Sequence, residues 1–241
     1  MSTAAPTDRE KPNGPRSRKG AATRARLLDA AKTVFEKDGF LEARISDIAE
    51  QAGLSHGSFY HYFDSKEQIF REIAKEMTDL LNAPLSTAIF IPASTAPPRE
   101  RIRAGIRRYL ESYRAEARII GVIEQVSRYD AELNSERFHH QQRDRDRVVG
   151  SIRQLQALGL AAPDIDPAIA AHSLGAMVSR FAEMWLVQGL VESDLELAAE
   201  QLARLFGNAL QLRDRPRPQE GQDDDDLDGP RPFLRPGPHQ G

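Results

Sequence analysis

The chain has 241 residues, of which 40% are hydrophobic and 29% charged, and it contains no cysteine. This length and balance are typical of a globular protein with one large domain or two modest ones. The lack of cysteine excludes a disulfide framework, a cysteine-based zinc site and a thiol nucleophile. No apolar run approaches the roughly 20 residues of a membrane span, and the polar N-terminus lacks the apolar core of a secretory signal. We therefore expect a cytoplasmic protein with no membrane partner.

The net charge of −3 hides a gradient along the chain. Residues 1–26 carry seven Lys or Arg against two acids, whereas residues 219–241 carry six acids against two Arg. This asymmetry is typical of a basic arm near a polyanion and an acidic tail away from it. Pro and Gly recur at both ends, so we expect a disordered basic arm at 1–20 and a disordered acidic, Pro-rich tail at 214–241. The alternative is that both tails are merely solvated.

Three helices are predicted in the first part of the chain. Apolar residues at helical spacing indicate a first helix from Thr23 that stops at Gly39. A second ends at Gly53, and a third runs from Ser55, a good N-cap, to Phe63. Two short helices joined by a Gly-containing turn are typical of a helix-turn-helix, which places its second helix in the major groove of DNA.

The rest of the chain is also predicted to be helical. Asp64 and Ser65 can cap a fourth, longer helix, and several prolines then predict a loop of roughly 15 residues that begins near Pro84. No segment has the alternating period of a strand, so the predicted fold class is all-α. We expect a three-helix DNA-binding domain at 21–68 and a helical ligand-binding and dimerisation domain at 69–213. Its later helices are expected at 102–113, 119–126, 148–158, about 168–188 and 194–212.

The exposed face of the third helix carries residue types that suit a reader of the major groove. His56 and Ser58 are short enough to reach base edges and can donate or accept hydrogen bonds. Gly57 has no side chain, so the helix can come close to DNA. Tyr60 and Tyr62 offer hydroxyls on rigid rings for contacts to phosphates.

The stretches LLDAAKTVFEKDGF and ISDIAEQAGLSHGSFYHYF, followed by Lys66, resemble the tetracycline-repressor (TetR) family. The resemblance covers about Thr23 to Phe70 and implies a homodimer that binds a palindromic double-stranded DNA operator. Lys66 lies in the first turn of a helix, where a cation is unfavourable, and a phosphate partner would explain its placement. By the same resemblance, the residues that touch phosphates are Ser55, Tyr60, Tyr62 and Lys66, and those nearest the bases are His56, Gly57, Ser58 and His61.

Arg44 departs from the family pattern, which commonly has a threonine here that caps the second helix and contacts a phosphate. An arginine cannot cap the helix in that way but can still reach a phosphate. We therefore keep Arg44 as a DNA contact, and the alternative is a solvated surface residue.

A weaker part of the resemblance lies in the last two helices, which pair with those of a second subunit in the family. Both helices are apolar on more than one face, and such a helix needs a core and a partner to cover it. The alternative is that both faces are filled within one chain. The predicted interface residues are Met184, Trp185, Leu202, Leu205, Phe206 and Ala209.

The resemblance also implies an effector pocket among the helices from 99 to about 188. Apolar lining and scarce buried charge favour a hydrophobic or amphipathic effector, such as a lipid, acyl-CoA, sterol or drug-like compound. Each candidate could instead be ordinary core. The candidate lining residues are Tyr109, Tyr113, Ile120, Glu124, Phe138, Met177 and Phe181.

His139 and His140, beside Asp144 and Asp146, could be mistaken for a metal site. Adjacent helical residues point about 100° apart and do not converge on one ion, so we expect neither a metal nor a cofactor.

The predicted function is a ligand-responsive, sequence-specific repressor that its effector releases from DNA. The alternatives are a ligand-independent or architectural DNA-binding protein, an effector-activated regulator, and an all-helical enzyme. The sequence contains no phosphate loop, no HExxH and no GxSxG motif, so we expect no enzymatic activity.

Overall fold

The computed structural model describes residues 18–91 and 94–214. Over these residues the chain forms nine helices and no strand, which confirms the all-α prediction. None of the described helices is long and apolar enough to cross a membrane. The predicted arm before residue 18 and the tail after residue 214 lie outside the described residues. The helices are α1 (Arg18–Glu42), α2 (Ile45–Gln51), α3 (His56–Phe59), α4 (Lys66–Ala88), α5 (Pro98–Ala115), α6 (Ala117–Ser127), α7 (Ala131–Ala157), α8 (Pro167–Leu186) and α9 (Leu195–Ala209).

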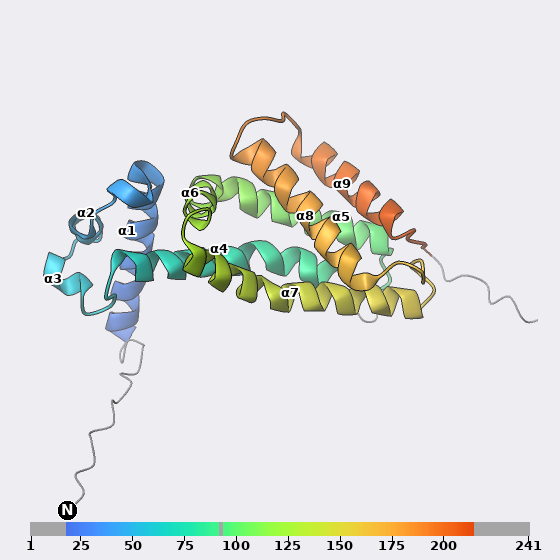
Figure 1. Ribbon diagram of the computed structural model, residues 1–241, viewed down its shortest axis with the longest axis horizontal. Helices are drawn as coiled ribbons and strands as arrows, with labels where there is room; N and C mark the ends of the chain where they lie inside the picture. The colour runs from blue at the N-terminus through green and yellow to red at the C-terminus, as the bar shows by residue number, and fades with distance from the viewer. Residues whose placement is uncertain (1–17, 92–93, 215–241) are drawn as a thin grey trace, which may run out of the picture.

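A small N-terminal lobe of α1, α2 and α3 stands at one end of a larger helical body (Figure 1). Helix α4 begins in the lobe and runs on into the body, where α5 and α7 pack against it. Helices α8 and α9 complete the body, and α6 lies where the lobe and the body meet. The lobe and the body are therefore joined by a continuous helix.

The turn between α2 and α3 has the backbone geometry that a helix-turn-helix requires. Gly53 has a φ of 65°, in the left-handed region that favours glycine. The Leu54 amide donates to the Ala49 carbonyl at 2.9 Å, which is the long-range bond of a Schellman motif. Arg26 of α1 donates to the Ala52 carbonyl and so fixes the turn against α1.

Helix α3 is shorter than the sequence predicts. It ends at Phe59, and turns rather than helix lead on to Phe63. The amides of Tyr62 and Phe63 both donate to the Phe59 carbonyl, at 2.9 and 3.1 Å. Phe59 and Phe63 are both buried in the core of the lobe. We attribute the early end of α3 to the burial of both rings rather than to helix propensity.

Helix α4 begins at the predicted cap. The Ser65 hydroxyl accepts a hydrogen bond from the Gln68 amide at 3.1 Å, and the Gln68 side chain accepts one from the Asp64 amide. This reciprocal pair closely resembles a capping box, which satisfies two otherwise unpaired amides.

The expected loop from Pro84 is wrong, because α4 continues through Pro84 as far as Ala88. A proline inside a helix costs about 3 kcal/mol, since it removes a hydrogen bond and crowds the preceding turn. Close packing on α5 offsets this cost. A Cβ added to Gly105 of α5 would lie 2.7 Å from the Ala88 Cβ and 3.1 Å from the Pro84 carbonyl oxygen.

Two clusters of buried side chains hold the fold together, one in the body and one in the lobe. The lobe cluster extends along α4 as far as Ala74 and includes Ile119 and Ile123 of α6. Lys32 of α1 also forms an ion pair with Glu116, the residue before α6. The core of the lobe thus extends past residue 68 and is packed against α6 as well as α4.

Candidate nucleic-acid interface and effector pocket

The residues predicted to contact DNA gather on and around α3, at the end of the lobe away from the body (Figure 1). Tyr60 is half exposed, and its ring lies edge-on to that of His56 with 5.4 Å between the ring centroids. This leaves a surface of hydrogen-bonding groups around a bare backbone at Gly57. The exposed members of the set are Arg44, Ser55, His56, Gly57, Tyr60 and His61, and the partly buried ones are Ser58, Tyr62 and Lys66.

Ser55 occupies the N-cap position of α3, but its side chain makes no cap hydrogen bond, which corrects the prediction. The Ser58 amide, which a capping side chain would bind, already donates to the Ser55 carbonyl at 2.9 Å. The Ser55 hydroxyl instead lies 2.7 Å from the Ser58 hydroxyl. A hydroxyl can both donate and accept, so each keeps capacity for a further partner.

Arg44 occupies the N-cap position of α2 and makes no side-chain cap hydrogen bond, as its side chain predicts. The residue is exposed and precedes the helix that packs against α3. Its guanidinium is therefore available to an external anion.

Lys66 has protein partners where the sequence analysis expected a phosphate. Its ammonium group donates to the carbonyls of Phe40, Leu41 and Ala43, at 2.7, 3.2 and 3.0 Å. It also lies 4.7 Å from the centroid of the Phe40 ring. These carbonyls follow the break in α1 at Gly39, where φ is 74°. An ammonium has three donors, so these bonds explain the position of Lys66 without DNA.

We expect Lys66→Met to destabilise the free protein by about 1–3 kcal/mol, because three carbonyls lose a charged donor. Thermal or urea unfolding without DNA measures this, and Lys75→Met, an exposed lysine on the same helix, is the control. The opposite result would be an unchanged unfolding midpoint together with weaker salt dependence of DNA binding. A slope of log binding constant against log salt concentration that is smaller in magnitude by about 0.9 would instead assign Lys66 to a phosphate.

A cavity of about 660 Å³ lies among α4, α5, α6, α7 and α8. Four of the seven candidate effector residues line it, namely Tyr109, Tyr113, Glu124 and Phe138. The other three do not. Ile120 is buried in the core of the body, and Met177 and Phe181 pack against that core.

Charged side chains line this cavity, which corrects the expectation that buried charge is scarce. Arg137 pairs with Glu124 at 2.6 Å, and the Arg137 side chain is only 16% exposed. Arg180 pairs with Glu183 at 2.7 Å, and the Glu183 side chain is also 16% exposed. Most of these charges are therefore neutralised by a neighbour in the wall.

Two tyrosines of α5 place phenol groups in the same cavity. Tyr109 and Tyr113 are 6% and 3% exposed, and neither hydroxyl has a hydrogen-bond partner among the described residues. Burial is the main cause that raises the pKa of each phenol, and the nearby Glu124 carboxylate raises both further. Both phenols thus remain protonated at neutral pH and can donate a hydrogen bond.

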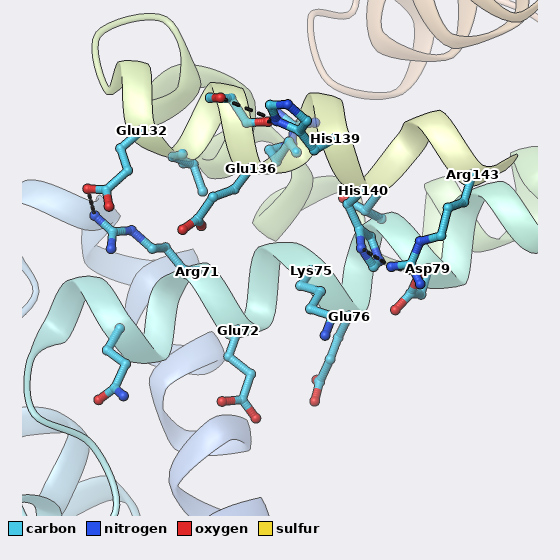
Figure 2. Close-up of a pocket in the computed structure, with 15 residues that line it drawn as sticks. Arg71, Glu72, Lys75, Glu76, Asp79, Glu132, Glu136, His139, His140 and Arg143 are labelled. Carbon is cyan, nitrogen blue, oxygen red and sulfur yellow. Dashed lines mark hydrogen bonds and ion pairs between the residues drawn. The ribbon is translucent and has the colours of Figure 1, made fainter. Parts of the chain in front are cut away.

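A second, polar groove of about 1020 Å³ lies between α4 and α7 (Figure 2). Arg71 of α4 pairs with Glu132 of α7, and Asp79 of α4 pairs with His140 of α7. Glu76 of α4 points away from α7 in this view (Figure 2). The two pairs hold α4 against α7.

The two adjacent histidines in this groove turn to different partners. The His139 Nδ1 lies 2.7 Å from the Ser135 carbonyl, while His140 faces Asp79 (Figure 2). Among the described residues, no group of three or more His, Asp or Glu could hold a metal ion.

The predicted dimer residues of α9 divide between its two faces. Leu202 and Phe206 are 4% and 1% exposed and belong to the core of their own chain, so assigning them to a dimer interface is wrong. Leu205 is 54% exposed, and Ala209 is exposed one turn further on. Residues three or four apart share a helix face, which explains the division.

In α8 the predicted interface residues are only partly buried. Trp185 packs against the core of the body, and the Arg114 guanidinium lies 4.9 Å from its ring centroid. Met184 is also partly buried. Two other apolar residues of these helices are exposed and lie outside the predicted set, Ile169 of α8 at 69% and Leu197 of α9 at 54%.

Comparison with known proteins gives a match in the lobe and a likeness over most of the chain. Residues 27–73 match the model of bacterial regulatory proteins of the tetR family. Over 56 residues the chain is 45% identical to the HTH-type transcriptional repressor KstR2 of Rhodococcus jostii, a stretch that is 23% of this chain and 28% of that protein. The matched stretches span 28% of KstR2 and 44% of the HTH-type transcriptional regulator RutR of Escherichia coli, so the chain matches less than half the length of these relatives.

Two solved structures share the fold. The fatty acid degradation regulator FadR of Bacillus halodurans has a TM-score of 0.66 at 16% identity, with 86% of this chain and 100% of that one covered. FadR of Bacillus subtilis, solved in complex with stearoyl-CoA, has a TM-score of 0.63 at 20% identity, with 76% and 96% covered. At these identities the likeness concerns the fold.

Proposed function

Because the chain belongs to the tetR family of bacterial regulatory proteins, we propose that it is a homodimeric, sequence-specific DNA-binding regulator that responds to a small molecule. The observation that carries this proposal is the exposed surface formed by His56 and Gly57 of α3 and by Tyr60 directly after it. Buried phenylalanines pack the other side of this segment into the lobe. Residues 21–68 carry DNA binding, and residues 69–213 carry effector binding and dimerisation.

In the DNA complex, α3 enters the major groove with His56, Gly57, Ser58 and His61 nearest the bases. Ser55, Tyr60, Tyr62 and Arg44 take phosphates, which fix the register of the protein on the duplex. Two such lobes in a dimer read two half-sites about one helical turn apart, and the two-fold axis of the dimer makes the operator palindromic.

The effector acts through α4. Ile69 and Phe70 of this helix belong to the core of the lobe, whereas Leu81 and Leu85 line the 660 Å³ cavity. A ligand in the cavity that favours one position of α4 thereby favours one separation of the two lobes. We propose that the ligand lowers operator affinity while the dimer stays intact, so that the protein acts as a repressor that its ligand releases from DNA. The similarity to KstR2, which is named a transcriptional repressor, supports this direction of the response.

The ligand we propose is an amphipathic small molecule. The wall of the cavity combines Leu81 and Leu85 with the hydroxyls of Tyr109 and Tyr113, which a purely hydrophobic compound would leave without hydrogen-bond partners. The stearoyl-CoA held by the FadR structure is one amphipathic molecule bound by this fold. An effector-activated regulator is the alternative for the sign of the response.

Selection of duplexes from a random DNA pool by the full chain tests the proposal. We expect an enriched palindrome, and we expect Ser58→Ala to relax the preference at one base pair by about 1–3 kcal/mol. Tyr62→Phe, which removes a phosphate-facing hydroxyl, should weaken all duplexes about equally. A pool without enrichment would favour an architectural DNA-binding protein, and an unchanged ranking with Ser58→Ala would remove that residue from base reading.

A further inference from the structure

The charges in the wall of the 660 Å³ cavity are paired, except for one. Arg137 is paired with Glu124, and Arg180 with Glu183. Asp144, which also lines the cavity, is paired with Arg147 at 2.8 Å.

Arg145 lines the same cavity and has no ion pair among the described residues. One guanidinium nitrogen donates to the Gln141 side chain at 2.8 Å, and the other terminal nitrogen, Nη1, is buried without a hydrogen-bond partner. The guanidinium lies 4.9 Å from the centroid of the Phe138 ring, and that ring is 53% exposed. A buried cationic donor without a partner is costly, and a ligand anion would satisfy it.

The phenols of Tyr109 and Tyr113 are a second polar group in the cavity wall that a ligand could contact. Tyr109 and Tyr113 lie near Glu124 and Arg137, whose charges act on both phenols. Arg145 follows Arg137 by two turns of α7, which corresponds to about 12 Å along the helix. The cavity thus presents an unpaired cation on α7 about two turns beyond the arginine that lies near the two phenols, with apolar wall from Leu81, Leu85 and Val148.

We infer that the effector is an amphipathic carboxylate whose anionic end binds Arg145 and whose distal polar group binds Tyr109 and Tyr113. This inference rests on the proposed function and names its ligand class. The carboxylate supplies the counter-ion that the wall lacks, and an apolar chain of about ten atoms is comparable in length to the rise of about 12 Å between Arg137 and Arg145 along α7. Its apolar surface covers the exposed Phe138 ring.

Calorimetric titration of the full chain in the absence of DNA tests the ligand class. The probes are 10-hydroxydecanoate, decanoate, which lacks the distal hydroxyl, and 1,10-decanediol, which lacks the charge. We expect 10-hydroxydecanoate to bind most tightly and the diol most weakly. Arg145→Gln should weaken both carboxylates about 10- to 100-fold and change diol binding less than about twofold.

The conservative variants separate binding from folding. Arg145→Lys should retain part of the carboxylate affinity, and Tyr113→Phe should weaken 10-hydroxydecanoate several-fold but leave decanoate unchanged. Arg153→Gln, an exposed arginine of α7 outside the cavity, is the matched control and should bind as the wild type does.

Three results would overturn the inference: no carboxylate binds the wild-type chain, the diol binds as tightly as the carboxylates, or Arg145→Gln binds all probes unchanged. Selection of DNA by the same preparation keeps the two proposals apart. If DNA is enriched but no carboxylate binds, the proposed DNA-binding function stands and the proposed ligand class is wrong. If a carboxylate binds but no DNA is enriched, the ligand class stands and the proposed DNA-binding function is wrong.

Discussion

Gly57→Leu should reduce operator affinity about 100-fold and leave the fold intact. Gly57 is exposed on α3, its φ is not positive, and a Cβ added there would meet nothing within 4 Å. The free protein therefore has room for the side chain, and loss of a helical glycine is mildly favourable. In the proposed complex the same space is filled by the edges of the bases. Forcing a side chain into a packed interface costs up to about 3 kcal/mol, which corresponds to about 100-fold in affinity.

Gly150→Leu on α7 is the matched control, because a Cβ there also meets nothing within 4 Å and the site is remote from α3. We expect it to bind the operator as the wild type does. Fluorescence anisotropy with the selected operator and thermal unfolding are measured for both variants. If Gly57→Leu binds the operator normally, α3 does not approach DNA at this residue. If it instead unfolds at a much lower temperature, the glycine serves the fold.

The lobe could be predicted from the sequence because its signals are local. The glycine at Gly53 supplies the left-handed turn, and Ser65 with Gln68 supplies a cap within four residues. Each of these depends on neighbours in the chain rather than on tertiary contacts. The end of α3 was less predictable, since it depends on burying Phe59 and Phe63 together.

The course of α4 could not be predicted, because its stability through Pro84 depends on a residue of another helix. The backbone of α5 approaches α4 at Gly105, about 20 residues later in the chain, and no local pattern announces that contact. A proline in a sequence predicts the end of a helix, but tertiary packing can keep the helix continuous through it.

The sequence predicted a pocket among these helices but not the charged lining of the cavity that lies there. Of the candidates proposed for the pocket, Tyr109 and Tyr113 line the cavity, whereas Met177 and Phe181 pack against the core instead. Arg145 was missed because a charged residue on a polar helix is usually solvated, and only the fold brings it into the same cavity as the phenols. The sequence signal that could have identified Arg145 was a charged residue on the side of α7 that faces the body.

Leu205→Glu should convert the protein into a monomer and reduce operator affinity by about two to four orders of magnitude. Leu205 lies on the outward face of α9 and is 54% exposed, so a carboxylate there is solvated in a single chain. In the proposed dimer the same carboxylate would be buried in an apolar interface, where an unpaired charge is strongly disfavoured. A monomer also loses the second half-site, and with it the gain in affinity of about 10²–10⁴ that linked binding provides.

For Phe206→Ala, at the next residue, we expect a loss of folding stability, which we do not expect for Leu205→Glu. Phe206 is 1% exposed in the core of its own chain, so its truncation should cost about 3–5 kcal/mol of stability. Sedimentation velocity, operator affinity and thermal unfolding are measured for both variants. Leu205→Glu should sediment as a monomer with a nearly unchanged unfolding temperature. A dimeric Leu205→Glu protein with normal operator affinity would place the interface elsewhere, because an apolar contact at this residue could not accept the charge.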